Sequence, residues 1–199
     1  MMTWRTNSYT PPWFMGKALP TANSQITASL ELIDAGKIIN LSGQKVYWYV
    51  DDELIGAGIG LQKITFNAPS VTDNILDVRA EIPGYNPNSS NPILKTIEIP
   101  IINPEAVIES PYPGNQLFTS SPTFKAWPFF FNTQDVTKFG FTWTANGATS
   151  QNTENPDTLV VNIDPASPSG FSLGIGLTIQ TSGGIYNSAS KNKNLVLIK

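Results

Sequence analysis

One strand pattern occurs twice in this chain, and the duplication constrains the fold more than any other feature of the sequence. Residues 45–52 read KVYWYVDD and residues 140–147 read GFTWTANG; each is an alternating strand centred on a tryptophan and followed by a polar turn. Trp48 and Trp143 lie 95 residues apart (143 − 48). Because a β-sandwich domain has about 100 residues, this spacing predicts one β-domain present in two copies.

Period-two alternation of apolar and polar residues runs through both halves, whereas helical periodicity is almost absent. Residues 25–32 place Ile26, Ala28 and Leu30 on one face, and the corresponding strand of the second half begins at Phe124. Short alternating strands separated by Gly-, Pro- and Asn-rich turns are typical of an antiparallel sandwich. We therefore expect an all-β fold.

The division between the two copies falls at Asn103 and Pro104. A residue that precedes proline is restricted to extended backbone geometry, and few residues separate the flanking strands. We expect a first domain over residues 1–103 and a second over residues 104–199, joined by a short linker. The predicted fold is thus two tandem antiparallel β-sandwiches.

Histidine and cysteine are both absent from the sequence. The chain therefore has no imidazole base, no Ser-His-Asp triad, no thiolate nucleophile and no disulfide. The carboxylates of the second half are few and do not form the pair that glycoside hydrolysis needs. A net charge of −3 without a basic stripe argues against nucleic-acid binding. We expect no enzyme, no catalytic residue and no bound cofactor.

The acidic run Asp51, Asp52 and Glu53 is the candidate metal site. Together with Asp34 or Asp73, these carboxylates would supply the hard oxygen ligands that calcium prefers. The Asp-x-Asp-x-Asp-Gly spacing of a calcium loop is missing, and three acidic residues at a hairpin more often form a solvated turn. We favour the solvated turn, with calcium as the alternative.

The sharpest functional signal is an aromatic run in residues 125–131, which read KAWPFFF. When this strand is aligned with residues 27–33, Trp127, Phe129 and Phe131 occupy a face that is mostly polar in the first half. The alignment predicts an outward aromatic ladder on the second domain. Such ladders stack on sugar rings or bind another protein surface.

Two structural alternatives remain for the ladder. Pro128 cannot donate a hydrogen bond to a neighbouring strand, and a bulge there would exchange the inward and outward faces. The aromatics are otherwise covered by another part of the chain, such as the domain junction or residues 111–113. If the ladder is accessible, replacing Phe129 with serine changes the free energy of unfolding by less than about 1 kcal/mol and weakens binding.

Trp48 and Trp143 resemble the buried strand-C tryptophan of Ig-like and PKD-like modules. The PKD pattern Trp-x-Phe-Gly-Asp-Gly is matched only in part, because residues 47–52 (YWYVDD) lack both glycines. Residues 9–20 (YTPPWFMGKALP) resemble the opening of predicted surface proteins of small-genome, uncultured bacteria. The resemblance implies tandem Ig-like/PKD-like sandwiches, preceded by a leader and followed by a membrane anchor.

These features together predict a non-catalytic structural or adhesion module at the cell surface or outside the cell. Its expected roles are display, spacing or protein–protein contact, and its expected partner is a protein or glycan surface. Two other functions fit the same sequence. A pair of carbohydrate-binding modules would use outward planar aromatics, whereas a filament or surface-layer subunit would self-assemble through free edge strands.

Overall fold

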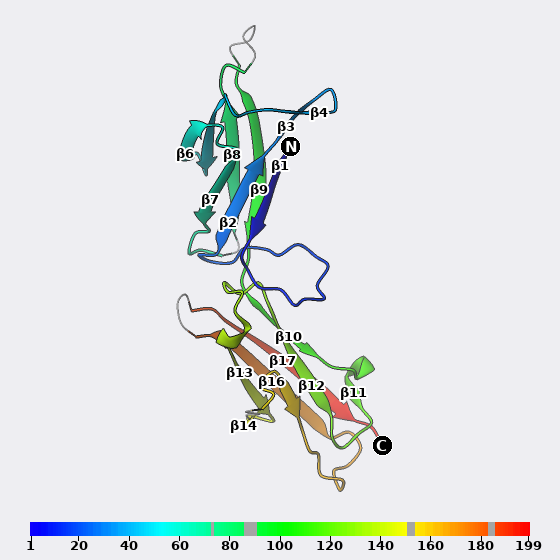
Figure 1. The fold of residues 1–199 in the computed structure, drawn as a ribbon. Coiled ribbons are helices and arrows are strands. Elements are labelled where there is room, and N and C mark those ends of the chain that lie inside the picture. Colours follow the sequence, from blue (N-terminus) through cyan, green and yellow to red (C-terminus); the bar gives the residue numbers. More distant parts are fainter. Residues whose placement is uncertain (73, 86–90, 151–153, 183–185) are drawn as a thin grey trace. The chain divides into compact units, whose positions relative to one another are not determined.

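The computed structural model describes residues 1–72, 74–85, 91–150, 154–182 and 186–199 (Figure 1). Their regular structure is β-strand apart from two short 3-10 helices, which confirms the all-β fold class. The chain divides into two compact units. The first comprises Met1–Ser8 and Lys17–Asn103, and the second comprises Tyr9–Gly16 and Pro104–Lys199.

The first unit contains two antiparallel sheets and a small hairpin. One sheet has the order β1 (Met2–Thr6), β2 (Gln25–Leu30), β7 (Lys63–Asn67). The other has the order β6 (Glu53–Ile59), β5 (Lys45–Val50), β8 (Asn74–Ile82), β9 (Ile93–Ile101). The hairpin consists of β3 (Leu32–Asp34) and β4 (Lys37–Ile39).

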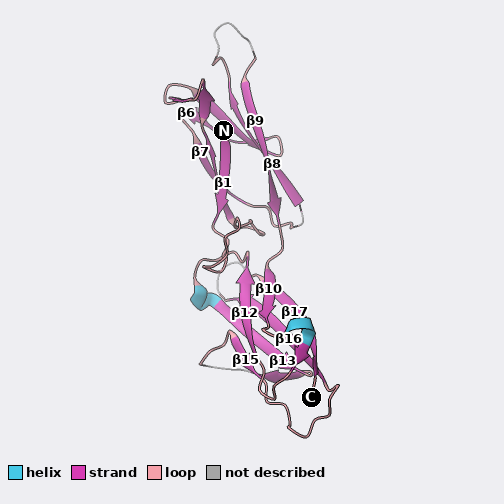
Figure 2. Cartoon of the chain, turned by 90° about the vertical axis from the view of Figure 1, so that its right-hand side faces the viewer, coloured by secondary structure: helices cyan, strands magenta, loops and turns pink. Residues whose placement is uncertain are grey.

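The second unit repeats this plan with one additional edge strand. One sheet has the order β10 (Glu105–Glu109), β12 (Thr123–Phe129), β15 (Thr158–Val160). The other has the order β11 (Gln116–Leu117), β17 (Ser188–Leu197), β16 (Ser172–Thr181), β13 (Phe139–Ala145), β14 (Ala148–Ser150). Strand β11 runs parallel to β17, and the 3-10 helices are η1 (Pro113–Asn115) and η2 (Val136–Lys138), drawn in cyan in Figure 2.

Both units distribute their strands between the sheets in the same way. One sheet is formed by β1, β2 and β7 in the first unit and by β10, β12 and β15 in the second. The tryptophan strand and the last two long strands form the core of the other (β5, β8 and β9; β13, β16 and β17). This distribution is that of an Ig-like sandwich, in which hydrophobic inner faces of two antiparallel sheets meet.

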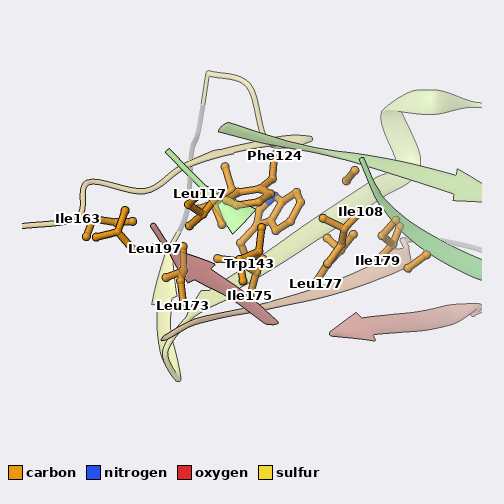
Figure 3. Packing of buried hydrophobic residues seen from close by; sticks show 14 of the residues in the cluster. Ile108, Leu117, Phe124, Trp143, Ile163, Leu173, Ile175, Leu177, Ile179 and Leu197 are labelled. Carbon is orange, nitrogen blue, oxygen red and sulfur yellow. The ribbon is translucent and has the colours of Figure 1, made fainter. Parts of the chain in front are cut away.

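Trp48 and Trp143 are fully buried, each in the hydrophobic core of its own unit. The indole Nε1 of Trp48 donates a hydrogen bond to the Leu61 carbonyl at 2.8 Å, and that of Trp143 donates to the Pro156 carbonyl at 3.1 Å. The acceptor lies 13 residues after the tryptophan in both units. Figure 3 shows Trp143 packed near Phe124 in the second core. The prediction of two buried, equivalent tryptophans is confirmed.

Segment Tyr9–Gly16 belongs to the second unit, whereas the boundary predicted at Asn103 and Pro104 assigns it to the first domain. The Tyr9 amide donates to the Phe131 carbonyl at 2.8 Å, and the Phe130 amide donates to the Tyr9 carbonyl at 2.6 Å. This backbone pairing attaches the segment to the residues that directly follow β12. We refer to Tyr9–Gly16 as the strap.

Candidate interaction surface

Phe131, predicted to lie on the outward ladder, is a core residue of the second unit. Its side chain is fully buried, and its ring meets the Phe139 ring edge to face with centroids 5.3 Å apart. The cause is the backbone at Phe130, whose φ of +61° is rare for a residue with a side chain. This conformation breaks the alternation after Phe129, so the ladder prediction is wrong for Phe131.

Phe129 is also buried, with 8% of its surface exposed, but for a different reason. The strap residues Trp13 and Phe14 contact it edge to face, with ring centroids 5.9 and 5.4 Å from that of Phe129. The alternative of intramolecular cover therefore holds at this position. Residues 111–113 do not supply the described contacts; Tyr112 packs on Phe124 instead, with centroids 5.7 Å apart.

Local interactions within the strap direct the Phe14 ring toward Phe129. The Phe14 amide donates to the Pro11 carbonyl at 2.9 Å, which closes a tight turn. A side chain at position 16 would collide with the Phe14 ring unless the ring moved, so glycine allows this close approach. At the other end, the Tyr9 ring lies 5.0 Å from that of Phe139, and its burial raises the pKa of the Tyr9 phenol.

Trp127 is the one ladder residue that keeps partial access to solvent. Trp13 of the strap, which is 54% exposed, meets it at an interplanar angle of 85° with centroids 5.3 Å apart. The Trp127 Nε1 donates to Glu109 Oε2 at 2.6 Å. The Lys125 Nζ lies 4.7 Å from the Trp127 ring centroid and 3.8 Å from Asp157 Oδ2.

A hollow of about 510 Å³ opens between the strap and strand β10, lined by Trp13, Val107, Glu109 and Trp127. Val107 stands directly opposite Trp127 in the β10–β12 pairing, and Glu109 stands opposite Lys125. Strand geometry therefore places Val107 and Glu109 on the same outer face as Trp127. We refer to these four residues as the Trp hollow.

Of the four residues of the Trp hollow, the sequence pattern predicted only Trp127 as part of a functional surface. Val107 and Glu109 could have been found, because they alternate with the buried Ala106 and Ile108 and so occupy the outer face of β10. Trp13 lies in a Pro-rich segment without periodicity, and no local pattern indicates that it packs on a strand more than 100 residues away. Only the tertiary structure brings it to Trp127.

The acidic run forms a tight turn, and two of its side chains contact other residues of the same unit. Asp51 and Asp52 have φ of +47° and +65°. The Asp51 Oδ1 accepts from the Asp77 amide at 3.0 Å, and Asp52 pairs with the Arg79 guanidinium at 2.7 Å. Among the described residues, no group of three acidic side chains is placed to hold a metal ion; Asp73 lies outside them. These contacts favour the solvated turn over the calcium alternative.

The chain matches no protein-family model and no curated protein sequence. It is similar in structure to three domains of the outer capsid protein Hoc of bacteriophage RB49, with a TM-score of 0.47 and 11% identity. That match covers 99% of this chain and 59% of the phage fragment. The chain therefore spans less than two thirds of that structure.

Two further structures show the same kind of similarity. The fibronectin III-like modules of CbhA from Clostridium thermocellum match with a TM-score of 0.29 and 12% identity over 100% of this chain and 93% of theirs. A fragment of intimin, solved with the intimin-binding domain of its receptor Tir, matches with a TM-score of 0.32 and 12% identity over 89% and 60%. The similar structures include tandem Ig-like and fibronectin III-like domain proteins. At these identities the similarity concerns the fold alone.

Among the described residues, no helix has the length and hydrophobicity that crossing a bilayer requires.

Proposed function

We propose that the chain is a tandem of two Ig-like domains that acts as a non-catalytic interaction module at the cell surface or outside the cell. Its binding face is the Trp hollow together with the outer side of the strap. The observation that carries this proposal is the position of Trp13. Its indole is held against Trp127 and Phe129, yet more than half of its surface faces solvent.

The apolar residues of the strap fall into two groups, one that contacts the core side and one that faces solvent. Tyr9 and Phe14 contact Phe139 and Phe129 and so attach the strap to the rest of the second unit. Trp13 and Met15 face outward, and Met15 is 96% exposed. An exposed apolar side chain adds little to folding stability, whereas its area remains available for burial by a partner. The outward residues therefore favour association as the role of this surface.

The chemistry of the Trp hollow suits binding rather than catalysis. Among the described residues, Glu109 is its one ionisable lining side chain, and it accepts a hydrogen bond from an indole. General acid–base catalysis needs a positioned proton donor or acceptor with a partner to complete the transfer, and the sequence offers no histidine or cysteine for that role.

A binding assay with matched variants tests the proposal. Because the chain has no cysteine, one added after Lys199 allows labelling at a single position. The labelled protein is applied to a printed glycan array, to immobilised extracellular-matrix proteins and to intact bacterial cells. We expect binding to at least one surface and at least a fivefold loss for Trp13→Ser. The control Phe118→Ser removes another exposed aromatic of the second unit, outside the hollow.

Circular dichroism and thermal melting establish that each variant is folded. Binding that Trp13→Ser and Phe118→Ser reduce equally would contradict the assignment of this face. A folded wild-type protein that binds none of the surfaces would contradict the interaction function itself.

A further inference from the structure

The Trp hollow combines two perpendicular indoles with an aliphatic side chain. Trp13 and Trp127 meet at 85°, and Val107 lies opposite Trp127 on the neighbouring strand. A compact group that enters the corner between the indoles is therefore bounded by aromatic and aliphatic surface on more than one side. The electron-rich face of an indole attracts cations more strongly than that of any other side chain.

The hollow also carries a negative charge. The hydrogen bond from Trp127 Nε1 engages Oε2 of Glu109 and positions the carboxylate beside the indole pair. An indole N–H is a neutral donor, so this bond leaves the charge of Glu109 in place. Lys125 stands opposite Glu109 on β12, but it pairs with Asp157 and is not among the residues that line the hollow. The charge of Glu109 thus complements a cationic ligand.

The chain itself shows that its tryptophans accept ammonium groups. Lys125 Nζ lies 4.7 Å from the Trp127 ring centroid, and in the first unit Lys17 Nζ lies 3.3 Å from that of Trp4. Both distances fall within the roughly 6 Å range of a cation–π contact.

A neutral sugar fits this lining less well. Its hydroxyl groups need several directional partners, and a hydroxyl that is buried without one costs free energy. Apart from the indole N–H groups, Glu109 is the one lining side chain with hydrogen-bonding atoms among the described residues, and one of its oxygens already accepts from Trp127. A methylated ammonium group needs apolar walls and one opposite charge, which are the features present.

We propose that the Trp hollow binds an organic cation, namely a quaternary or N-methylated ammonium group, in the corner that Trp13 and Trp127 form, with Glu109 as the counter-charge. This inference rests on the proposed function and names the ligand class for the same surface. Recognition by aromatic walls and a single carboxylate depends on both the charge and the methyl groups of the ligand.

Choline and its neutral isostere 3,3-dimethylbutan-1-ol separate charge from shape. Both are titrated into the full chain, with indole N–H shifts followed by NMR and heats by calorimetry. We expect choline to bind at least about fivefold more tightly than the neutral alcohol. Trp13→Ser and Glu109→Gln should each weaken choline binding at least about threefold. Glutamine keeps an acceptor for Trp127 while removing the charge, and Phe118→Ser is the control.

Several outcomes would overturn the inference. Equal affinity for choline and the neutral alcohol, or unchanged choline binding in Glu109→Gln, would show an apolar hollow without charge selection. The protein could bind the array, matrix or cell surfaces through Trp13 and yet not bind choline. This result would refute the organic cation as the ligand and leave the proposed function in place. If Trp13→Ser alters neither assay, both proposals fail.

Discussion

Strands β2 and β12 occupy the same place in the two units, yet they differ on one face. Their inner residues are equivalent, since Ile26 and Ala28 are buried in the first core as Phe124 and Ala126 are in the second. Their outer faces differ, because Ser29 of β2 aligns with Trp127 of β12.

The two outer faces differ in chemistry as well as in size. On the first unit, the Thr27 hydroxyl lies 3.1 Å from that of Thr65 on β7, which makes a small polar pair across the sheet. On the second unit, the corresponding face carries indole and phenyl rings under the strap. The inner pattern therefore specifies the sandwich, whereas the outer face is free to acquire a binding role.

The largest expected effect comes from the feature that the units share. Trp48→Ala and Trp143→Ala should each lower the free energy of unfolding of their own unit by about 3–5 kcal/mol, because each leaves a large cavity. Each also leaves a backbone carbonyl, Leu61 or Pro156, without its indole donor. Chemical denaturation followed by NMR signals assigned to each unit measures the two losses separately.

Trp48→Phe and Trp143→Phe serve as controls, since they keep much of the aromatic volume and remove the hydrogen bond. We expect smaller losses from both. Equivalence of the units would be contradicted if one alanine variant cost several kcal/mol and the other almost nothing.

The next largest change in the free energy of unfolding is expected on the outer faces of β2 and β12, where the two units differ. Phe129→Ser should destabilise the second unit by about 2–3 kcal/mol, because the ring is buried beneath Trp13 and Phe14. This replaces the sequence-based expectation of less than about 1 kcal/mol, which assumed an accessible ring. The matched change in the first unit is Glu31→Ser, at the aligned and half-buried position, with an expected change below about 1 kcal/mol.

Denaturant midpoints of the two variants provide the measurement, with m-values checked for a two-state transition in each unit. If Phe129→Ser were as mild as Glu31→Ser, the strap would not cover the ring in solution. The contact of the strap with Phe129 would then have to be rejected, together with the position of Trp13 against Trp127.

The sequence predicted the features that depend on local periodicity. Alternation identified the strands and the equivalent tryptophans, because side chains on a strand must point to opposite faces. The same rule failed at Phe131, since the positive φ of Phe130 is a conformation that no phenylalanine favours by itself. The pairing of Tyr9 with Phe131 and the contact of Phe14 with Phe129 depend on tertiary structure. Of the proposed binding face, alternation could place Trp127, Val107 and Glu109 on an outer face, whereas Trp13 could not be predicted.

The smallest effect concerns the connections that follow β2 and β12. The first unit uses the hairpin β3–β4 before β5, whereas the second uses the 3-10 helix η2 before β13. Asp135 caps η2, and its Oδ1 accepts from the Thr137 hydroxyl at 2.6 Å and from the Thr137 amide at 3.0 Å. Both hydrogen bonds lower the pKa of the Asp135 carboxyl, and the one from the hydroxyl has the larger effect.

Thr137→Val removes the hydroxyl and keeps the amide, so the pKa of Asp135 should rise toward its ordinary value. A carboxyl whose pKa is depressed by folding stabilises the native state above its unfolded pKa, near 4, and loses this contribution as the pH falls through the folded pKa. The second unit of the variant should therefore lose less stability on acidification, while the first unit is unchanged. An NMR titration of the Asp135 carboxyl measures the shift directly. An identical pKa in wild type and Thr137→Val would mean that the hydroxyl does not cap η2 in solution.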